Sequence, residues 1–198
     1  MKPEFNADEQ DLLKKLSKKV FYGLINNLRL ARLGIYTPFG DIFTYDDIGV
    51  LVTGRSGHGK STLVQYFKKL HPEIVTKKSE DIAPVFCSGN SKPEFFPQNL
   101  LSLLTSDGKT LDLIVLFDER AADYDVHKMS YEEFLSDRSK KQGFQREPEA
   151  FRRYEDSLRH ITAFRIGKQL GYKDDGDLHA TYEIVRDIVQ SYSQPKKN

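Results

Sequence analysis

The first clear pattern in the chain is a hydrophobic residue at every fourth position between residues 8 and 32. These positions are Leu12, Leu16, Val20, Leu24 and Leu28. Residues four apart share one face of an α-helix, so the pattern predicts an amphipathic helix over 8–32, which Asn6 or Asp8 can cap. We expect its hydrophobic face to pack on the core. Because lysines flank that face, binding to a membrane surface or to a partner protein is the alternative.

Between residues 34 and 53 the hydrophobic residues gather in short, β-prone segments instead. Glycines and a proline separate the segments, and Asp46-Asp47 lies between two of them, 42–45 and 48–53. This arrangement is typical of an antiparallel ribbon joined by a tight turn. The sequence therefore predicts a β-ribbon that leads into a buried strand at 48–53.

The rest of the chain contains further helical and strand-like patterns. Helices are predicted over residues 60–70, 130–139, 148–170 and 178–192. A second buried strand is predicted over 111–117, and a shorter one near 74–75, because their hydrophobic residues run without helical spacing. Gly171 stands where the C-cap of the helix at 148–170 is expected. Residues 193–198 are polar, and we expect them to be disordered.

The composition narrows the class of protein. The chain has 198 residues and a formal net charge of +1, which fits one domain with a helical extension and gives no reason to expect a nucleic-acid binder. Its one cysteine, Cys87, cannot form an internal disulfide, and we interpret it as a packed thiol in a reducing compartment. No hydrophobic run approaches the ~20 residues of a membrane span, and no secretory signal core is visible. We therefore expect a cytoplasmic protein without a transmembrane segment.

The strongest chemical signal is a match to the phosphate-binding pattern G-x-x-x-x-G-K-[ST] at the end of the predicted strand 48–53. A predicted helix follows the match directly, as a phosphate-binding loop (P-loop) requires. We expect these residues to bind a nucleoside triphosphate: Gly54, Arg55, Ser56, Gly57, His58, Gly59, Lys60, Ser61 and Thr62. An ordinary glycine-rich turn before a helix is the alternative.

The residue types of this segment match the chemistry of a bound phosphate. Its glycines let the backbone turn tightly and point N–H groups at an anion, and the following helix adds its N-terminal dipole. Lys60 is expected to reach the β- and γ-phosphates, and the Ser61 hydroxyl to bind Mg²⁺. Because no Asn-Lys-x-Asp segment for guanine recognition is present, we expect ATP rather than GTP.

Three acidic residues are candidates for magnesium binding and catalysis. Asp118 follows the strand 111–117, where P-loop proteins place an acid that holds Mg²⁺ or its water. Glu119 is expected to activate a water or a hydroxyl, and Asp81 to accept the proton of a substrate hydroxyl. For Asp118 the alternative is a strand end that simply exits into water, and for Asp81 it is an ordinary surface loop. A basic stretch predicts either a lid over the phosphates or a solvated loop, and it contains Arg138, Lys140, Lys141 and Arg146.

The segment 39–61 resembles the catalytic domain of HPr kinase/phosphorylase. In that family a β-ribbon leads into a Gly-Val-Leu-hydrophobic-Thr-Gly strand and a Ser-Gly-x-Gly-Lys-Ser loop, and this chain has Gly-Val-Leu-Val-Thr-Gly and Ser-Gly-His-Gly-Lys-Ser there. Segments 113–125 and 163–172 are similar too, so the resemblance covers about residues 35–190. It implies an oligomeric kinase that uses ATP and Mg²⁺ to phosphorylate a hydroxyl of a protein or small molecule.

Two features of that family are not found in the sequence. Its paired aspartates after the first helix are replaced here by residues 75–78, Val-Thr-Lys-Lys. Its Gly-rich signature before the second strand is not recognisable between Ser91 and Thr110. A regulatory ATP- or GTP-binding module with little or no kinase activity is therefore the alternative from another functional class.

A second resemblance leads to a further alternative. The segment 56–63, followed by His71-Pro72-Glu73, is similar to guanylate kinases and related nucleotide kinases. The Arg- and Tyr-containing pocket with which those enzymes bind a nucleoside monophosphate is not visible after residue 75. A nucleotide kinase therefore ranks second to the HPr-kinase-like interpretation.

Together the patterns predict an α/β fold with a P-loop NTPase-type sheet, flanking helices, a β-ribbon before the P-loop strand and an N-terminal amphipathic helix. We expect a helical extension at 1–33, a nucleotide-binding kinase domain at 34–192 and a tail at 193–198. The predicted function is an ATP-dependent phosphotransferase with a nucleotide and a protein substrate as partners. Catalysis is assigned to Lys60, Asp81 and Glu119, and Mg²⁺ binding to Ser61 and Asp118.

Overall fold

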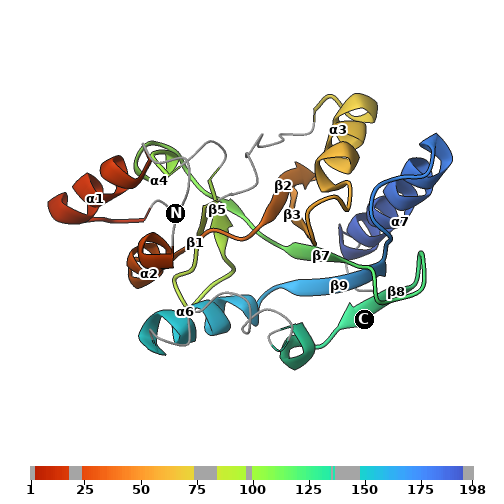
Figure 1. Ribbon diagram of the computed structural model, residues 1–198. Coiled ribbons are helices and arrows are strands. Elements are labelled where there is room, and N and C mark those ends of the chain that lie inside the picture. The colour runs from red at the N-terminus through yellow and green to blue at the C-terminus, as the bar shows by residue number, and fades with distance from the viewer. Residues whose placement is uncertain are drawn as a thin grey trace.

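The computed structural model describes residues 3–17, 24–73, 84–96, 100–134, 136 and 148–193. Within these residues the chain forms a mixed α/β fold, with two β-sheets and helices around them (Figure 1). The predicted α/β class with flanking helices is confirmed. No helix in the described part of the chain is long and apolar enough to span a membrane.

The larger sheet contains five strands in the order β2-β3-β7-β9-β8. Their bounds are Gly40–Tyr45 (β2), Ile48–Thr53 (β3), Leu113–Asp118 (β7), Thr162–Gly167 (β9) and Val126–Met129 (β8). Strands β3, β7 and β9 are parallel, whereas β2 and β8 pair antiparallel at the two edges. The predicted ribbon is confirmed as the β2–β3 hairpin. Its turn residues, Asp46 and Asp47, both have a positive φ, as two-residue hairpin turns favour.

The smaller sheet consists of four short antiparallel strands in the order β1-β4-β5-β6. Their bounds are Ile35–Tyr36 (β1), Val85–Phe86 (β4), Glu94–Phe95 (β5) and Lys109–Thr110 (β6). The described helices are α1 (Ala7–Ser17), α2 (Leu24–Arg32), α3 (Lys60–Leu70), α4 (Ser102–Thr105), α6 (Pro148–Leu158) and α7 (Asp175–Ser193). Helices α3 and α7 confirm the predictions at 60–70 and 178–192, and residues 131–134 are helical within the predicted 130–139.

Strands β3 and β7 of the larger sheet are buried on both faces. On one face, Val50 and Val52 of β3 belong to a hydrophobic cluster with Phe67 of α3 and with residues of α7. On the other face, Leu51 belongs to a cluster with Tyr154 of α6 and with residues of the smaller sheet. Because a strand covered on both faces has no polar side, β3 shows an unbroken hydrophobic run in the sequence.

The prediction of one helix over residues 8–32 is wrong. The described residues form two helices, α1 and α2, which do not lie along one axis in Figure 1. Leu13 of α1 and Leu30 of α2 belong to one buried cluster with Phe96 and Leu103. In a single straight helix these two leucines would be about 26 Å apart, at 1.5 Å per residue. Two shorter helices can bury both, so the expected packing of this region on the core is confirmed.

The prediction of one helix over residues 148–170 is also wrong. Helix α6 ends at Leu158, and residues 162–167 form β9. This strand pairs with β7 on one side and with β8 on the other, and pairing on both sides overrides the helical spacing of the sequence. Gly171 has a φ of +73°, but it lies in the turn after β9 rather than at a helix C-terminus. The predicted strand near 74–75 and the tail beyond 193 lie outside the described residues.

The two sheets meet at Gly49 of β3. Its carbonyl accepts a hydrogen bond from the Asp112 N–H at 2.9 Å, and its N–H donates to Asp112 Oδ2 at 3.0 Å. A Cβ on this glycine would lie 1.9 Å from the Thr110 carbonyl oxygen and 3.0 Å from the Phe95 ring. The backbone of β6 therefore packs directly against β3 and leaves no room for a side chain.

Gly49→Ala is expected to lower the free energy of unfolding by about 1–3 kcal/mol, because either β3 or β6 must move to admit the methyl group. Urea denaturation measures this change. Gly176→Ala, in the first turn of α7, is the control, since the nearest atom to its Cβ would be an Asp174 carboxylate oxygen at 3.2 Å. It is expected to change the stability by less than about 0.5 kcal/mol. An equally small effect at Gly49 would contradict this packing.

Candidate phosphate-binding site

The segment from Gly54 to Gly59 connects the end of β3 to the start of α3, as predicted from the sequence. Because β3 and β7 are parallel and paired, the carboxyl ends of the two strands lie side by side. The loop after β3 therefore lies near Asp118, the last residue of β7. Gly57 and Gly59 have φ values of +86° and +78°, in the left-handed region that favours glycine. Such a loop, at the N-terminus of a helix, can turn backbone N–H groups toward an anion.

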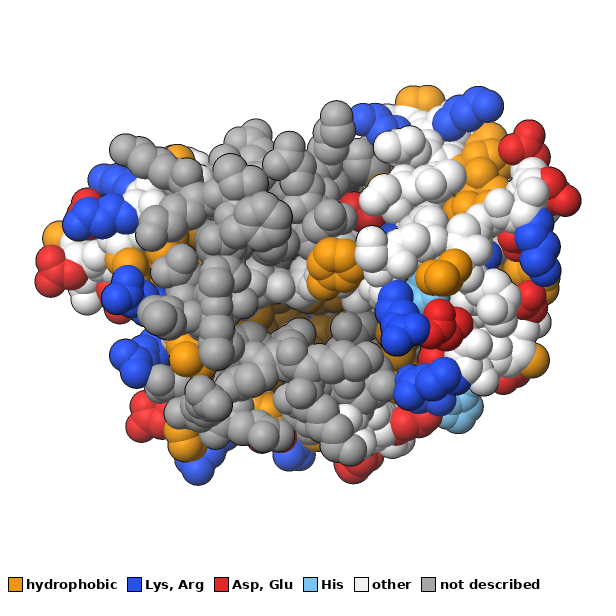
Figure 2. All heavy atoms as spheres, viewed as in Figure 1, with side chains coloured by type: hydrophobic (Ala, Val, Ile, Leu, Met, Phe, Trp, Pro, Cys, Tyr) orange, Lys and Arg blue, Asp and Glu red, His pale blue; other side chains and the backbone are white. Residues whose placement is uncertain are grey.

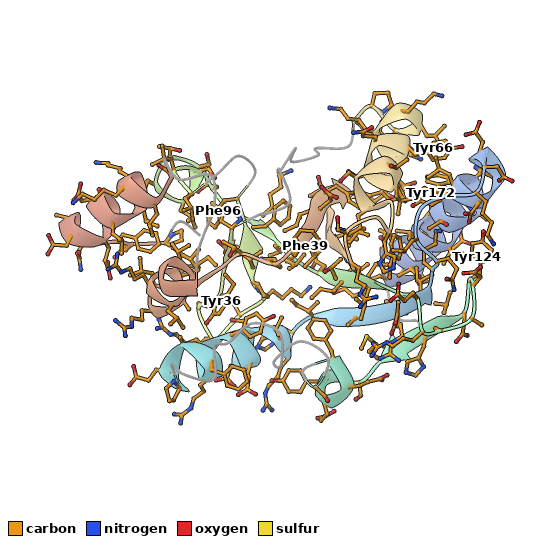
Figure 3. All side chains as sticks on the ribbon, in the orientation of Figure 1. Tyr36, Phe39, Tyr66, Phe96, Tyr124 and Tyr172 are labelled. Atoms are coloured by element: carbon orange, nitrogen blue, oxygen red, sulfur yellow. The ribbon has the colours of Figure 1, made fainter. Side chains whose placement is uncertain are left out.

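Lys60 begins α3, and its side chain is only 5% exposed. Its Nζ donates a hydrogen bond to the Arg55 carbonyl oxygen at 2.8 Å and lies 4.6 Å from the centroid of the Phe39 ring. Phe39 precedes β2 and is labelled in Figure 3. The ammonium group therefore lies between the loop backbone and an aromatic ring. A buried cation at this place supplies the counter-charge that a phosphate requires.

His58 supports the loop from inside, where the sequence suggested a nucleotide contact. Its side chain is 1% exposed, and its Nδ1 accepts a hydrogen bond from the Arg55 N–H at 3.0 Å. Within the described part of the chain, no group hydrogen-bonds to its Nε2, which lies 3.8 Å from Glu119 Oε2. Burial lowers the pKa of His58, although the Glu119 carboxylate opposes this shift. The ring is therefore neutral at pH 7 and has its proton on Nε2, because Nδ1 accepts.

The turn that follows β9 packs on the loop, which the sequence did not predict. The Gly171 N–H donates to the Gly57 carbonyl at 2.7 Å, and the Tyr172 hydroxyl donates to the Gly59 carbonyl at 3.2 Å. A Cβ on Gly59 would lie 2.3 Å from the Tyr172 ring, which is labelled in Figure 3. Burial raises the pKa of the Tyr172 hydroxyl, so it stays a hydrogen-bond donor at neutral pH. These contacts hold the loop backbone in place.

Asp118, the predicted magnesium ligand, is 6% exposed and surrounded by arginines. Arg120 donates to both carboxylate oxygens, from Nε and Nη2 at 2.8 Å each. Arg165 Nε lies 3.4 Å from Asp118 Oδ2. Hydrogen bonding to Arg120 is the main reason why the pKa of Asp118 falls to about 2. The carboxylate is therefore charged and already neutralised by two guanidinium groups.

Glu119, the predicted activating residue, forms an ion pair with Arg55 of the loop. The Arg55 side chain is 72% exposed and that of Glu119 is 29% exposed. Figure 2 shows basic and acidic side chains next to one another on the right-hand part of this molecular face. Through this ion pair, Glu119 connects the loop to the end of β7; its other oxygen lies 3.8 Å from His58 Nε2, too far for a hydrogen bond. In this arrangement the carboxylate holds the loop rather than pointing to open solvent.

Ser61, in the first turn of α3, is oriented by an acid that the sequence interpretation missed. Its hydroxyl donates to Asp41 Oδ2 at 2.8 Å. Asp41 belongs to β2 and is 6% exposed. In the sequence, a single acid among the hydrophobic residues of a ribbon gives no signal of its own. Asp41 reaches the loop because the hairpin register places it opposite Val52, close to the end of β3.

The remaining predicted residues divide into two groups. Ser56 and Thr62 are exposed, in the loop and in the first turn of α3. Asp81 and the basic stretch at 138–146 lie outside the described residues. Within residues 3–17, 24–73, 84–96, 100–134, 136 and 148–193, no group of three or more His, Cys, Asp or Glu could hold a metal ion.

Comparison with solved structures finds a structural likeness to a known protein. No family model matches the sequence, and no curated protein matches it either. The HPr(Ser) kinase/phosphatase from Coxiella burnetii is similar over 79% of this chain and 92% of that one, with 13% sequence identity and a TM-score of 0.41. Similarity at this level says nothing of the reaction, so the function has to be inferred from the residues of the site.

The ion pairs of Asp118 predict a pH-dependent stability. Folding lowers the pKa of this carboxyl group from an ordinary value of 3.8 to about 2. A carboxylate with a lowered pKa stabilises the fold above its ordinary pKa and loses that contribution as the pH falls from about 4 to about 2. Asp118→Asn is therefore expected to lower the free energy of unfolding by about 1–2 kcal/mol at pH 7, a range that allows for solvent screening of the exposed Arg120.

Urea denaturation at a series of pH values tests this prediction. The stability difference between wild type and Asp118→Asn should shrink as the pH approaches 3. Asp156→Asn is the control, because its carboxylate is 45% exposed and pairs only at 3.7 Å with Arg159; it should change the stability by less than about 0.5 kcal/mol. A difference for Asp118→Asn that is the same at pH 7 and pH 3 would show that its charge contributes nothing.

Proposed function

We propose that this chain is an ATP-dependent phosphotransferase that binds ATP at residues 54–62 and transfers a phosphoryl group to a hydroxyl of a protein or small molecule. The observation that carries this proposal is the buried Lys60 at the end of a strand–glycine loop–helix unit. The helix N-terminus, the loop N–H groups and this ammonium group would together stabilise the negative charge of the phosphates. Catalysis of phosphoryl transfer consists mainly of such positioning and charge stabilisation.

The residues present fit a nucleotide with its magnesium ion. Gly57 and Gly59 allow the left-handed backbone turns of the loop, and Ser61 presents a hydroxyl at the first turn of α3. Lys60 would exchange its hydrogen bond to the Arg55 carbonyl for one to a phosphate oxygen. A bound Mg²⁺ would supply positive charge that offsets the negative charge of the phosphates.

The finer assignment as an HPr-kinase-like enzyme is supported by the sequence of the segment 39–61. The resemblance of this segment to that family predicts a protein or small-molecule hydroxyl as the acceptor. The resemblance of residues 56–63 and 71–73 to nucleotide kinases makes a nucleoside monophosphate the second choice. ATP in preference to GTP, a homo-oligomeric state and a cytoplasmic location stay predictions from the sequence.

A second candidate function, a regulatory nucleotide-binding module, is favoured by the arginine pairs of the two acids at the end of β7, Asp118 and Glu119. Asp118 is bound by Arg120 and Arg165, and Glu119 by Arg55. Arg120 lowers the pKa of Asp118 to about 2, so this carboxylate is a poor proton acceptor, because the guanidinium group stabilises its charged form. Such a module would bind ATP or GTP, hydrolyse it slowly or not at all, and pass the bound state to a partner.

Calorimetric titration with ATP and with GTP, with and without Mg²⁺, tests nucleotide binding. Wild type is expected to bind ATP more tightly than GTP. Lys60→Ala should weaken ATP binding at least about tenfold, because a hydrogen bond to a charged group contributes roughly 1.5–3 kcal/mol. Lys69→Ala, an exposed lysine of the same helix, is the matched control and should bind like wild type. If folded wild-type protein binds neither nucleotide, the proposed function is wrong.

Transfer of label from γ-labelled ATP separates the two candidate functions. A phosphotransferase should label a protein or small molecule of a cell extract in wild type and not in Lys60→Ala. Glu119→Gln should reduce this transfer about tenfold or more while ATP binding persists, if Glu119 activates the acceptor. Glu73→Gln, a 72% exposed acid beyond α3, should leave transfer unchanged. If wild type binds ATP but shows no Lys60-dependent transfer of label, the regulatory module is favoured. Label on a nucleoside monophosphate would identify a nucleotide kinase.

A further inference from the structure

The start of β2 lies along the start of α3, and two consecutive residues of α3 contact it. Phe39, just before β2, has its ring 4.6 Å from Lys60 Nζ, and Asp41 accepts the hydrogen bond of the Ser61 hydroxyl at 2.8 Å. The hairpin register explains this arrangement, because Asp41 pairs with Val52, two residues before the loop. An acid of the ribbon is thereby placed at the residue that a P-loop uses for its cation.

Asp41 occupies a place where a carboxylate is costly. Every residue of β2 is buried. The next two residues after Asp41, Ile42 and Phe43, are fully buried, one in each of the two hydrophobic clusters that cover the larger sheet. Moving a carboxylate out of water costs several kcal/mol unless hydrogen bonds and charges compensate. A hydrophobic residue would satisfy the strand pattern equally well, so the acid itself calls for a chemical explanation.

We propose that Asp41 orients the Ser61 hydroxyl and binds, together with it, the divalent cation of a bound nucleoside triphosphate. When the hydroxyl donates its hydrogen bond to Asp41, the lone pairs of the Ser61 oxygen are left for a cation. The negative charge of the carboxylate favours a cation at this oxygen, and carboxylates also accept hydrogen bonds from the waters that Mg²⁺ keeps. This inference rests on the proposed function, since it deepens the assignment of the nucleotide site.

Asp118 is less suited to this role, although the sequence predicted it. Both of its oxygens are hydrogen-bonded by Arg120, with Arg165 close to one of them. A divalent cation there would have to displace a bidentate guanidinium and approach two positive charges. Asp41 is instead bonded to the hydroxyl that is itself a candidate cation ligand. We therefore assign the cation to the β2 side of the loop and not to the β7 side.

The Mg²⁺ dependence of ATP binding, measured by calorimetry, tests this assignment. Wild type should bind ATP more tightly with Mg²⁺ than in a chelator. Asp41→Asn should lose about 10- to 100-fold of this Mg²⁺-dependent gain, as expected for a residue that supports a metal ligand, while its affinity for ATP in the chelator stays unchanged. Asp118→Asn should keep the gain, and so should Asp47→Asn, an exposed acid of the β2–β3 turn.

A double-mutant cycle identifies Ser61 as the residue through which Asp41 acts. Ser61→Ala should lose a similar part of the Mg²⁺-dependent gain, and the double variant should lose little more than either single variant, because the two residues act together. Thermal melting checks that each variant is folded. If Asp41→Asn is unstable, Asp41→Ser serves as the second variant, since it removes the charge and keeps a hydrogen-bond acceptor in the strand.

The possible outcomes separate this inference from the proposed function. Folded wild type that binds no ATP would refute both. Mg²⁺-dependent binding that survives in Asp41→Asn and is lost in Asp118→Asn would overturn the inference, leave the proposed function intact and return the cation to Asp118. Loss of ATP binding in the chelator as well would show that Asp41 only maintains the loop, which also contradicts the assignment.

Discussion

The register of the three parallel strands β3, β7 and β9 is the constraint on which the rest of the site depends. Thr53 lies opposite Leu116, and Leu116 opposite Arg165, so the strands end together at one edge of the sheet. The glycine loop, the carboxylate of Asp118 and the turn at 168–172 are therefore neighbours. The first N–H of that turn donates to the Asp118 carbonyl at 3.1 Å. A shift of one residue in β7 would exchange its two faces and disrupt both hydrophobic clusters.

Much of the strand–loop–helix unit could be predicted from the sequence, because local patterns determine it. The hydrophobic run of β3, the glycines of the loop and the helical spacing of α3 lie within about 25 consecutive residues. The strand β9 could not be predicted, because its identity depends on partners far away in the sequence; Phe164 faces Val115 of β7 and Lys128 of β8. Read alone, the same residues continue the helical spacing that begins in α6.

The residues of the candidate site that could be predicted are those that a local sequence pattern marks. The glycines and Lys60 are identified by their motif, and Asp118 by its place at a strand end. Asp41 and Tyr172 were missed, since each reaches the loop only through tertiary structure: the first by the β2–β3 register and the second by the turn after β9. The roles expected of Asp118 and Glu119 depend on the side chains around them. The sequence spacing does not show that arginines pair with both acids.

Arg55 connects the two sides of the loop. Its carbonyl accepts the hydrogen bond of Lys60, and its guanidinium group pairs with Glu119 at the end of β7. If Lys60 turns to a phosphate, that carbonyl loses a hydrogen bond from a charged donor, and the loop segment that holds the ion pair is free to adjust. Binding at the β2 side would thereby be linked to the position of Glu119 on the β7 side, by a contact that changes between two arrangements. A phosphotransferase could use this linkage to place its acids after ATP binds, and a regulatory module could use it to signal that ATP is bound. The same contacts would thus serve either of the two proposed functions.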